Sequence, residues 1–231
     1  MDKRDTPLCF VFVETVVSEI DRLSSQPTNA VTNSITAAIA ALPDPDPGLE
    51  YVQALLFEAA RSSFLEPNTL ANVTRQLIDN LPAPSDEKFE KGIASKTRER
   101  WKGPNKPAHG EEISEYIENW VYLNRFVAHL TQLHVPLGDY GLWTLDRAFN
   151  PQAGGYREDE RAYHVPAAAA WIDILGAEMY RWSGEGQWEQ WKRGFEAVCQ
   201  SSDAFPADTR EQAQMAFGRM REVEESGGRE A

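Results

Sequence analysis

The chain has 231 residues, of which 42% are hydrophobic and 26% are charged, an ordinary composition for a globular protein that is long enough to bury one core. Acidic residues number 36 against 23 basic ones, so the formal net charge is −13. A surface of that sign repels phosphate backbones and anionic lipid, which excludes nucleic acid and membranes as expected partners.

The N-terminal segment, MDKRDTPLCFVFVETVV, combines early basic residues with an apolar run. Glu14 and Thr15 break this run and no small-residue cleavage site follows, so we interpret the segment as a first helix and not as a signal peptide. Cys9 and Cys199 lack the spacing of metal ligands and are interpreted as buried, unpaired thiols of a reducing compartment. We therefore expect a cytoplasmic protein.

Apolar residues recur at helical spacing through the first 81 residues. The four stripes are Phe10, Val13, Val17 and Ile20; Val31, Ile35, Ile39 and Leu42; Val52, Leu55, Leu56 and Ala59; and Leu70, Val73, Leu77 and Leu81. The PDPDPG segment at 43–48 forms a rigid connector, because each proline fixes its own backbone. No segment keeps a period of two, so no strand is expected.

The composition changes at 82–110, which we predict to be a flexible basic loop. The part at 88–110 carries seven of the 23 basic residues and only two acidic ones, together with three glycines and two prolines. One interpretation is a solvated loop with a short helix. The other is a mobile lid, in which Trp101 closes over a ligand and the basic side chains meet an anionic group.

The second half of the chain also shows helical spacing. Predicted helices cover about 111–134, 140–150, 165–182, 187–200 and 207–225, with a flexible polar loop at 151–162 and a disordered tail at 226–231. Pro166 suits the first turn of its helix. The sequence thus predicts an all-α fold: a single compact domain over 1–225, built as an irregular bundle of about eight or nine helices.

Several kinds of chemistry have no motif here. The sequence contains no P-loop, no glycine-rich dinucleotide fingerprint, no H-E-x-x-H helix, no Cys/His cluster and no G-x-S-x-G elbow. Only four histidines are present, and three of them fall in or beside predicted loops or helix ends. We therefore predict that the protein uses neither a metal nor a cofactor.

Aromatic residues are the strongest remaining signal. Trp120, Trp143 and Trp171 fall on three predicted helices that we expect to pack together. They indicate either an aromatic-rich core or an apolar cavity for a small molecule, which usually carries a few polar groups. Asn124 lies on the apolar side of its helix beside Trp120, where it is either a satisfied structural amide or a ligand contact.

Asp173 is the unusual residue of the most apolar helix, since Ile172 and Ile174 flank it. If this carboxylate is buried, it must be paired or have a raised pKa. Arg147 is the candidate partner. The pair would be either a bridge that locks the fold or a device in which Asp173 orients Arg147 and Arg147 polarises a substrate carbonyl.

Tyr163 and His164 enter the same helix from the preceding loop and could donate hydrogen bonds at the mouth of a pocket. The catalytic candidates are therefore Arg147, Tyr163 and Asp173. The predicted substrate contacts are Trp101, Trp120, Asn124, Trp143, His164 and Trp171.

Two segments carry a family resemblance. LWTLDRAFN at 142–150, followed after a variable loop by VPAAAAWIDILGAEMY at 165–180, resembles a fungal, all-helical family known as a domain of unknown function. The family has a Trp and Arg element, which Trp143 and Arg147 match here as W-x-x-x-R, one residue shorter than the family's spacing, and then a V-P-A-A-x-x-W-I helix. The resemblance covers roughly 110–225. Members of the family that the chain resembles are often encoded in secondary-metabolite gene clusters. The resemblance therefore implies a role in making a small molecule.

The function that this resemblance and the aromatic pattern favour is a cofactor-independent enzyme acting on an apolar small molecule. The sharpest form is a cyclase of the pericyclase type, catalysing an intramolecular [4+2] cycloaddition as a Diels-Alderase does, or an isomerase. Such a reaction needs a substrate held in a reactive shape and a donor on its carbonyl, not a proton-transfer dyad. The alternatives are a non-catalytic helical interaction protein and a carrier for the same kind of metabolite.

Overall fold

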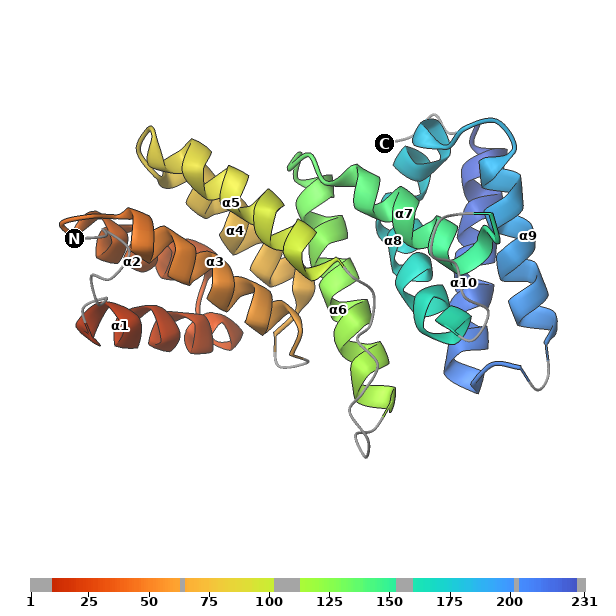
Figure 1. Ribbon diagram of the computed structural model, residues 1–231, viewed down its shortest axis with the longest axis horizontal. Helices are drawn as coiled ribbons and strands as arrows, with labels where there is room; N and C mark the ends of the chain where they lie inside the picture. The colour runs from red at the N-terminus through yellow and green to blue at the C-terminus, as the bar shows by residue number, and fades with distance from the viewer. Residues whose placement is uncertain (1–9, 63–64, 102–112, 153–159, 202–203, 228–231) are drawn as a thin grey trace. The chain divides into compact units, whose positions relative to one another are not determined.

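The computed structural model describes residues 10–62, 65–101, 113–152, 160–201 and 204–227, and every regular element in these ranges is a helix (Figure 1). The helices are α1 (Phe10–Asp21), the short 3-10 helix η2 (Arg22–Ser24), α2 (Thr28–Ala40), α3 (Asp46–Ala60), α4 (Pro67–Asn80), α5 (Ser85–Arg100), α6 (Ile113–Gln132), α7 (Gly138–Phe149), α8 (Arg161–Trp182), α9 (Gln187–Gln200) and α10 (Ala207–Glu225). The predicted all-α fold is confirmed, with ten α-helices in the described ranges where eight or nine are expected.

The additional helix is α5, which occupies much of the segment predicted as a flexible basic loop at 82–110. Phe89, Ile93 and Thr97 are buried at a spacing of four, so this helix buries only about one side chain per turn. Ion pairs between neighbouring turns, such as Lys91 with Glu87, support the charged remainder. The many charged residues and the glycine of α5 therefore obscure the helical spacing of its few apolar residues in the sequence. The rest of the predicted loop, at 102–110, lies outside the described residues.

The described chain forms two compact units by its contacts, where the sequence predicts one domain over 1–225. The first unit contains Met1–Lys102 and Leu133–Pro136, and therefore α1 to α5. The second contains Gly103–Gln132 and Leu137–Ala231, and therefore α6 to α10.

The prediction of buried thiols can be compared with the structure at one cysteine. Cys9 lies outside the described residues, while Cys199 of α9 is half-buried and free.

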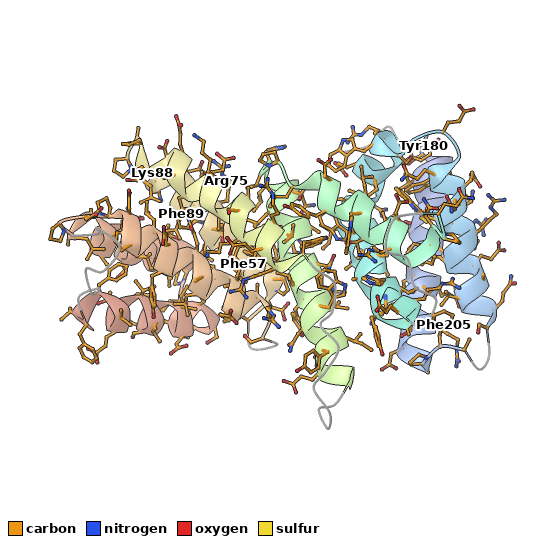
Figure 2. The ribbon with its side chains drawn as sticks, in the orientation of Figure 1. Phe57, Arg75, Lys88, Phe89, Tyr180 and Phe205 are labelled. Carbon is orange, nitrogen blue, oxygen red and sulfur yellow. The ribbon has the colours of Figure 1, made fainter. Side chains whose placement is uncertain are left out.

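In the first unit, α2 packs against α4 and α3 packs against α5. Phe57 of α3 and Phe89 of α5 are completely buried in its core (Figure 2). Proline marks the starts of two helices: α3 begins inside the PDPDPG segment, with Pro47 in its first turn, and α4 begins at Pro67. These prolines fit there because the first helical N–H groups have no partner in any case.

In the second unit, α8 is the central helix and packs against α6, α7 and α10 (Figure 1). Its tract from Val165 to Ile172 is buried throughout. Pro166 does not lie in the first turn as predicted, because α8 begins earlier, at Arg161. The proline lacks an N–H, so the carbonyl of Ala162 has no helical donor from that position.

The helix α8 also bends. Leu175 leaves the helical region, with φ −131° and ψ 29°, so two helical stretches join there. The next residue, Gly176, lies against α10, where an added Cβ would come within 3.3 Å of Val223 Cγ2. The bend and the missing side chain together let α10 approach α8 closely. The helix α10 itself ends at Glu225, immediately before the predicted tail at 226–231.

No helix within the described ranges is both long and apolar enough to serve as a membrane span.

Candidate functional site

The three tryptophans that the sequence singles out come from helices in mutual contact. Trp120 belongs to α6, Trp143 to α7 and Trp171 to α8, and these helices pack on one another within the second unit. The prediction that they pack together is confirmed. The three side chains divide, however, between two different clusters.

The first cluster centres on Asn124, which is completely buried. Its Oδ1 accepts a hydrogen bond from Trp171 Nε1 at 2.8 Å. Thr144 Oγ1 lies 3.1 Å from the same oxygen, and its hydroxyl also reaches the carbonyl of Tyr140 at 2.8 Å. Its Nδ2 donates to the carbonyl of Trp120 at 2.9 Å. We call Asn124, Thr144 and Trp171 the Asn124 network. It joins α6, α7 and α8 through one amide.

Close packing supports the Asn124 network. An added Cβ on Gly141 would lie 2.6 Å from Trp171 Cε3, so only a glycine lets α7 approach the indole ring this closely. Trp171 is itself completely buried. Since the oxygen of Asn124 accepts from Trp171 and its nitrogen donates to Trp120, this amide serves the fold, and we leave Asn124 and Trp171 out of the proposed ligand contacts.

The second cluster surrounds His164 on the first turns of α8. The side chain is 2% exposed. Its ring meets those of Trp120 and Trp143 edge-to-face, with centroids 6.1 Å and 6.0 Å away. The Arg147 guanidinium lies over the Trp143 ring, with 4.6 Å between its central carbon and the ring centroid. We call Trp120, Trp143, Arg147 and His164 the His164 cluster.

Two polar atoms of the His164 cluster are not satisfied. Nδ1 of His164 and Nε of Arg147 are both buried, and neither has a hydrogen-bond partner among the described residues. Burial, together with the positive charge of Arg147, lowers the pKa of His164 to about 4. The imidazole is therefore neutral at pH 7 and offers one donor and one acceptor beside a cation.

Asp173 takes no part in this cluster, and the predicted pair of Asp173 with Arg147 is wrong for the described structure. Asp173 is exposed. It lines a small hollow of about 60 Å³ with Arg125 and Arg219, among other residues. Two residues along a helix correspond to about 200°, so Asp173 faces away from the side on which Trp171 is buried. Its isoleucine neighbours do not reveal this direction.

Tyr163 and His164 lie inside α8, not in a preceding loop as predicted. Tyr163 is half-buried in the first turn. Because adjacent helical residues point about 100° apart, Tyr163 neighbours the cluster without sharing its face.

Trp101 follows the last residue of α5 in the first unit, and it is only 8% exposed. Its backbone N–H donates to the carbonyl of Thr97 at 2.9 Å, which continues the helical pattern by one residue. A buried side chain at a helix end differs from the exposed loop residue that the lid interpretation requires. The remaining residues of the predicted lid, 102–110, lie outside the described ranges.

A larger hollow, of about 560 Å³, lies on another face of the second unit, along α6, α8 and the start of α10. Ile117, Val121 and Pro166 give it an apolar wall, and Glu118, Arg125 and Asp208 give it charged edges. None of the predicted tryptophans lines it. The sequence analysis missed this surface because its residues show only an ordinary amphipathic pattern.

Comparison with known proteins gives a family and no function. A family model described as "Protein of unknown function (DUF3632)" matches residues 57–221. This range includes all four residues of the His164 cluster, and the match confirms the resemblance to a domain of unknown function. No curated protein and no solved structure matches the chain.

Proposed function

We propose that this chain, which belongs to the DUF3632 family of proteins of unknown function, binds an apolar small molecule at the His164 cluster. The molecule would carry a carbonyl or carboxylate group. We further propose that it cyclises or isomerises this molecule without a cofactor, in the manner of a pericyclase of specialised metabolism. The observation that carries the proposal is the pair of buried, unpartnered atoms, His164 Nδ1 and Arg147 Nε.

The chemistry of the His164 cluster suits such a ligand. Two indole rings offer apolar contact, and the guanidinium offers a positive charge with several donors. Buried polar groups are nearly always hydrogen-bonded, and the unpaired Nε–H of Arg147 can only donate, so this site favours a ligand that carries an acceptor. Because the imidazole of His164 is neutral, the guanidinium of Arg147 is the one positive charge of the cluster. It can bind one carbonyl or carboxylate group of the ligand.

Catalysis would follow from the same contacts. In an intramolecular [4+2] cycloaddition, three π bonds become two new C–C σ bonds and one new π bond, and no proton or electron leaves the molecule. Arg147 would polarise the carbonyl conjugated to the dienophile, and the indole rings would hold the chain in its folded, reactive shape. The exposed position of Asp173 removes it from this scheme.

Binding can be tested with 2-naphthoate, an apolar aromatic carboxylate, by following quenching of the tryptophan fluorescence. We expect saturable binding that Arg147→Met weakens about tenfold, as the loss of one charge-assisted contact implies. The matched control is Arg161→Met, since Arg161 also stacks on a ring, that of Phe205, at 5.5 Å. Equal affinity of the two variants would remove Arg147 from the site. We expect 2-naphthylmethylamine, a cation of similar shape, not to displace 2-naphthoate from the His164 cluster.

Turnover can be tested with the natural substrate. Deleting the gene in its host should cause an apolar precursor to accumulate, and purified protein should convert that compound to an isomer of the same mass. Heat-denatured protein is the control. Conversion at the same rate with denatured protein would refute catalysis.

The second candidate is a non-catalytic protein that binds the same kind of molecule, and the hollow of about 560 Å³ along α6, α8 and α10 favours it. This volume lies within the usual range of small-molecule pockets. Val121→Trp should fill that hollow, whereas Trp143→Ala should disturb the His164 cluster. Loss of naphthoate binding in the first variant alone would favour the second candidate.

A further inference from the structure

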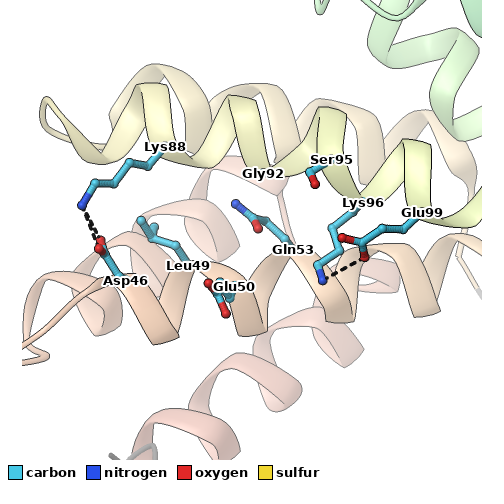
Figure 3. A pocket seen from close by; sticks show the side chains of 9 residues that line it. All are labelled: Asp46, Leu49, Glu50, Gln53, Lys88, Gly92, Ser95, Lys96 and Glu99. Carbon is cyan, nitrogen blue, oxygen red and sulfur yellow. Dashed lines mark hydrogen bonds and ion pairs between the residues drawn. The ribbon is translucent and has the colours of Figure 1, made fainter. Parts of the chain in front are cut away.

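A polar groove of about 320 Å³ runs between α3 and α5 of the first unit, as Figure 3 shows. The residues that line it are Asp46, Leu49, Glu50, Gln53, Lys88, Gly92, Ser95, Lys96 and Glu99. It lies in a different unit from the His164 cluster, and nothing in the proposed function uses it.

Gln53 occupies the groove as a buried amide that is only 3% exposed. Its Nε2 donates to the carbonyl of Phe89 at 3.1 Å. That bond fixes the direction of the amide, because only the nitrogen end can donate to a carbonyl. Oε1 of Gln53 accepts no hydrogen bond from any described residue, so the groove contains one oriented and unused acceptor.

Gly92 makes this arrangement possible. An added Cβ at this position would lie 2.1 Å from Nε2 and 2.4 Å from Oε1 of Gln53. Any other residue would therefore collide with the amide. The glycine leaves α5 without a side chain where the amide lies between the two helices, as Figure 3 shows.

The charges of the groove are distributed unevenly. Near one end, Lys88 Nζ binds Asp46 at 2.8 Å, and near the other, Lys96 Nζ binds Glu99 at 3.3 Å. Glu50 lies between these pairs and has no ion pair with any residue that the structure describes (Figure 3). With both lysines already neutralised, the middle of the groove presents two acceptors, Glu50 and the Gln53 oxygen.

We propose that this groove binds the alkylammonium group of a small primary amine. The ammonium ion has three donors and no acceptor, which matches a groove lined by a carboxylate and an unused amide oxygen. A net charge of −13 attracts cations to the protein generally. A metal ion suits the groove less well, because no group of three or more His, Cys, Asp or Glu in the described ranges is placed to hold one.

The test uses the full chain and n-butylamine at pH 7, with binding measured by calorimetry and by chemical-shift changes. Expected is saturable binding of n-butylamine and none of 1-butanol, which has the same length without the charge. Equal binding of the two compounds would overturn the proposal.

Variants locate the site. Glu50→Gln should weaken amine binding about tenfold, because it removes the charged partner of the ammonium group. Glu14→Gln, on the exposed face of α1, removes the same charge elsewhere in the first unit and should have no effect. Equal affinity of these two variants would refute the site.

Gln53→Met is a second test of the site, because it keeps the length of the side chain and removes the amide oxygen that would accept from the ammonium group. It should also weaken the binding of n-butylamine. If this variant unfolds in circular dichroism, Glu50→Gln and the 1-butanol comparison still decide. A lysine-containing peptide distinguishes the sources of an ammonium group. Binding of the peptide more tightly than n-butylamine would assign the groove to a partner protein and would overturn the proposal of a free amine.

Discussion

The Asn124 network and the His164 cluster lie on the same three helices, and each places a buried polar side chain among tryptophan rings. In the network, the amide of Asn124 binds Trp171, Thr144 and the backbone of Trp120. In the cluster, His164 Nδ1 and Arg147 Nε are buried without partners in the described structure. Similar aromatic surroundings thus contain one amide whose oxygen and nitrogen both have partners and two nitrogens that have none.

This difference separates a structural role from a binding role better than residue type does. A satisfied buried amide stabilises a unique packing of helices, because each lost bond leaves another buried group unpaired. An unsatisfied buried nitrogen has a free-energy cost of desolvation, and such exceptions in a native structure call for an explanation. A ligand that supplies the missing acceptor is the explanation that we propose for the His164 cluster.

The largest effect that we expect is in the network. Asn124→Ala would remove the bonds of the amide with Trp171 and with the Trp120 carbonyl, together with its contact to Thr144, and would take away the acceptor of the buried Trp171 Nε1. The free energy of unfolding should fall by about 3–5 kcal/mol, the range for breaking a buried hydrogen-bond network. Urea denaturation measures this change.

The matched control for that experiment is Asn119→Ala, which truncates a half-buried asparagine of the same helix. We expect it to change the free energy of unfolding by about 1 kcal/mol or less, because no described contact depends on its amide. If both asparagine variants lost the same stability, the network would not be the structural lock that its geometry indicates.

A smaller effect is expected from the titration of His164. Its pKa falls from 6.5 in the unfolded chain to about 4 in the folded protein. Between these values the unfolded state binds a proton that the folded state does not, so stability decreases as the pH falls. The loss should begin near pH 6.5 and reach at most about 3 kcal/mol near pH 4.

His164→Asn removes this titration, so the pH dependence of its unfolding free energy should be flatter than that of the wild-type protein between pH 4 and 6.5. The matched control is His134→Asn, because His134 is exposed and asparagine tolerates its φ of 66°. The control should retain the wild-type slope. A wild-type slope in His164→Asn would mean that the buried imidazole does not resist protonation.

The sequence predicts much of the fold and only part of the site. Helical spacing of apolar residues identifies most helices, and a separation of four places Arg147 over Trp143 as neighbouring groups. The helix α5 escapes prediction because its buried face has little more than one apolar side chain per turn. The burial of His164 and the exposure of Asp173 depend on which neighbouring helix covers each face of α8, and no local pattern contains that information.

The smallest effect should come from Asp173→Asn, which tests whether the apolar flanks of this residue mean anything for the site. An exposed side chain outside both clusters should change the free energy of unfolding by no more than about 0.5 kcal/mol. Binding of 2-naphthoate should also be unchanged. A loss of binding comparable with that of Arg147→Met would restore the orienting role of Asp173 and contradict the arrangement of the His164 cluster.

The same variant should have one local effect, at His129 of α6. Burial lowers the pKa of His129, the positive charge of Arg125 lowers it further, and the carboxylate of Asp173 opposes both. Removing that carboxylate should therefore move the pKa of His129 still lower, which NMR titration of its ring protons can measure. Such a shift, with naphthoate binding intact, would place Asp173 electrostatically with His129 and Arg125 and apart from Arg147. If the pKa of His129 were unchanged and that of His164 shifted, the assignment would be reversed. Asp173 would then act on the His164 cluster, although its side chain is exposed and lies outside that cluster.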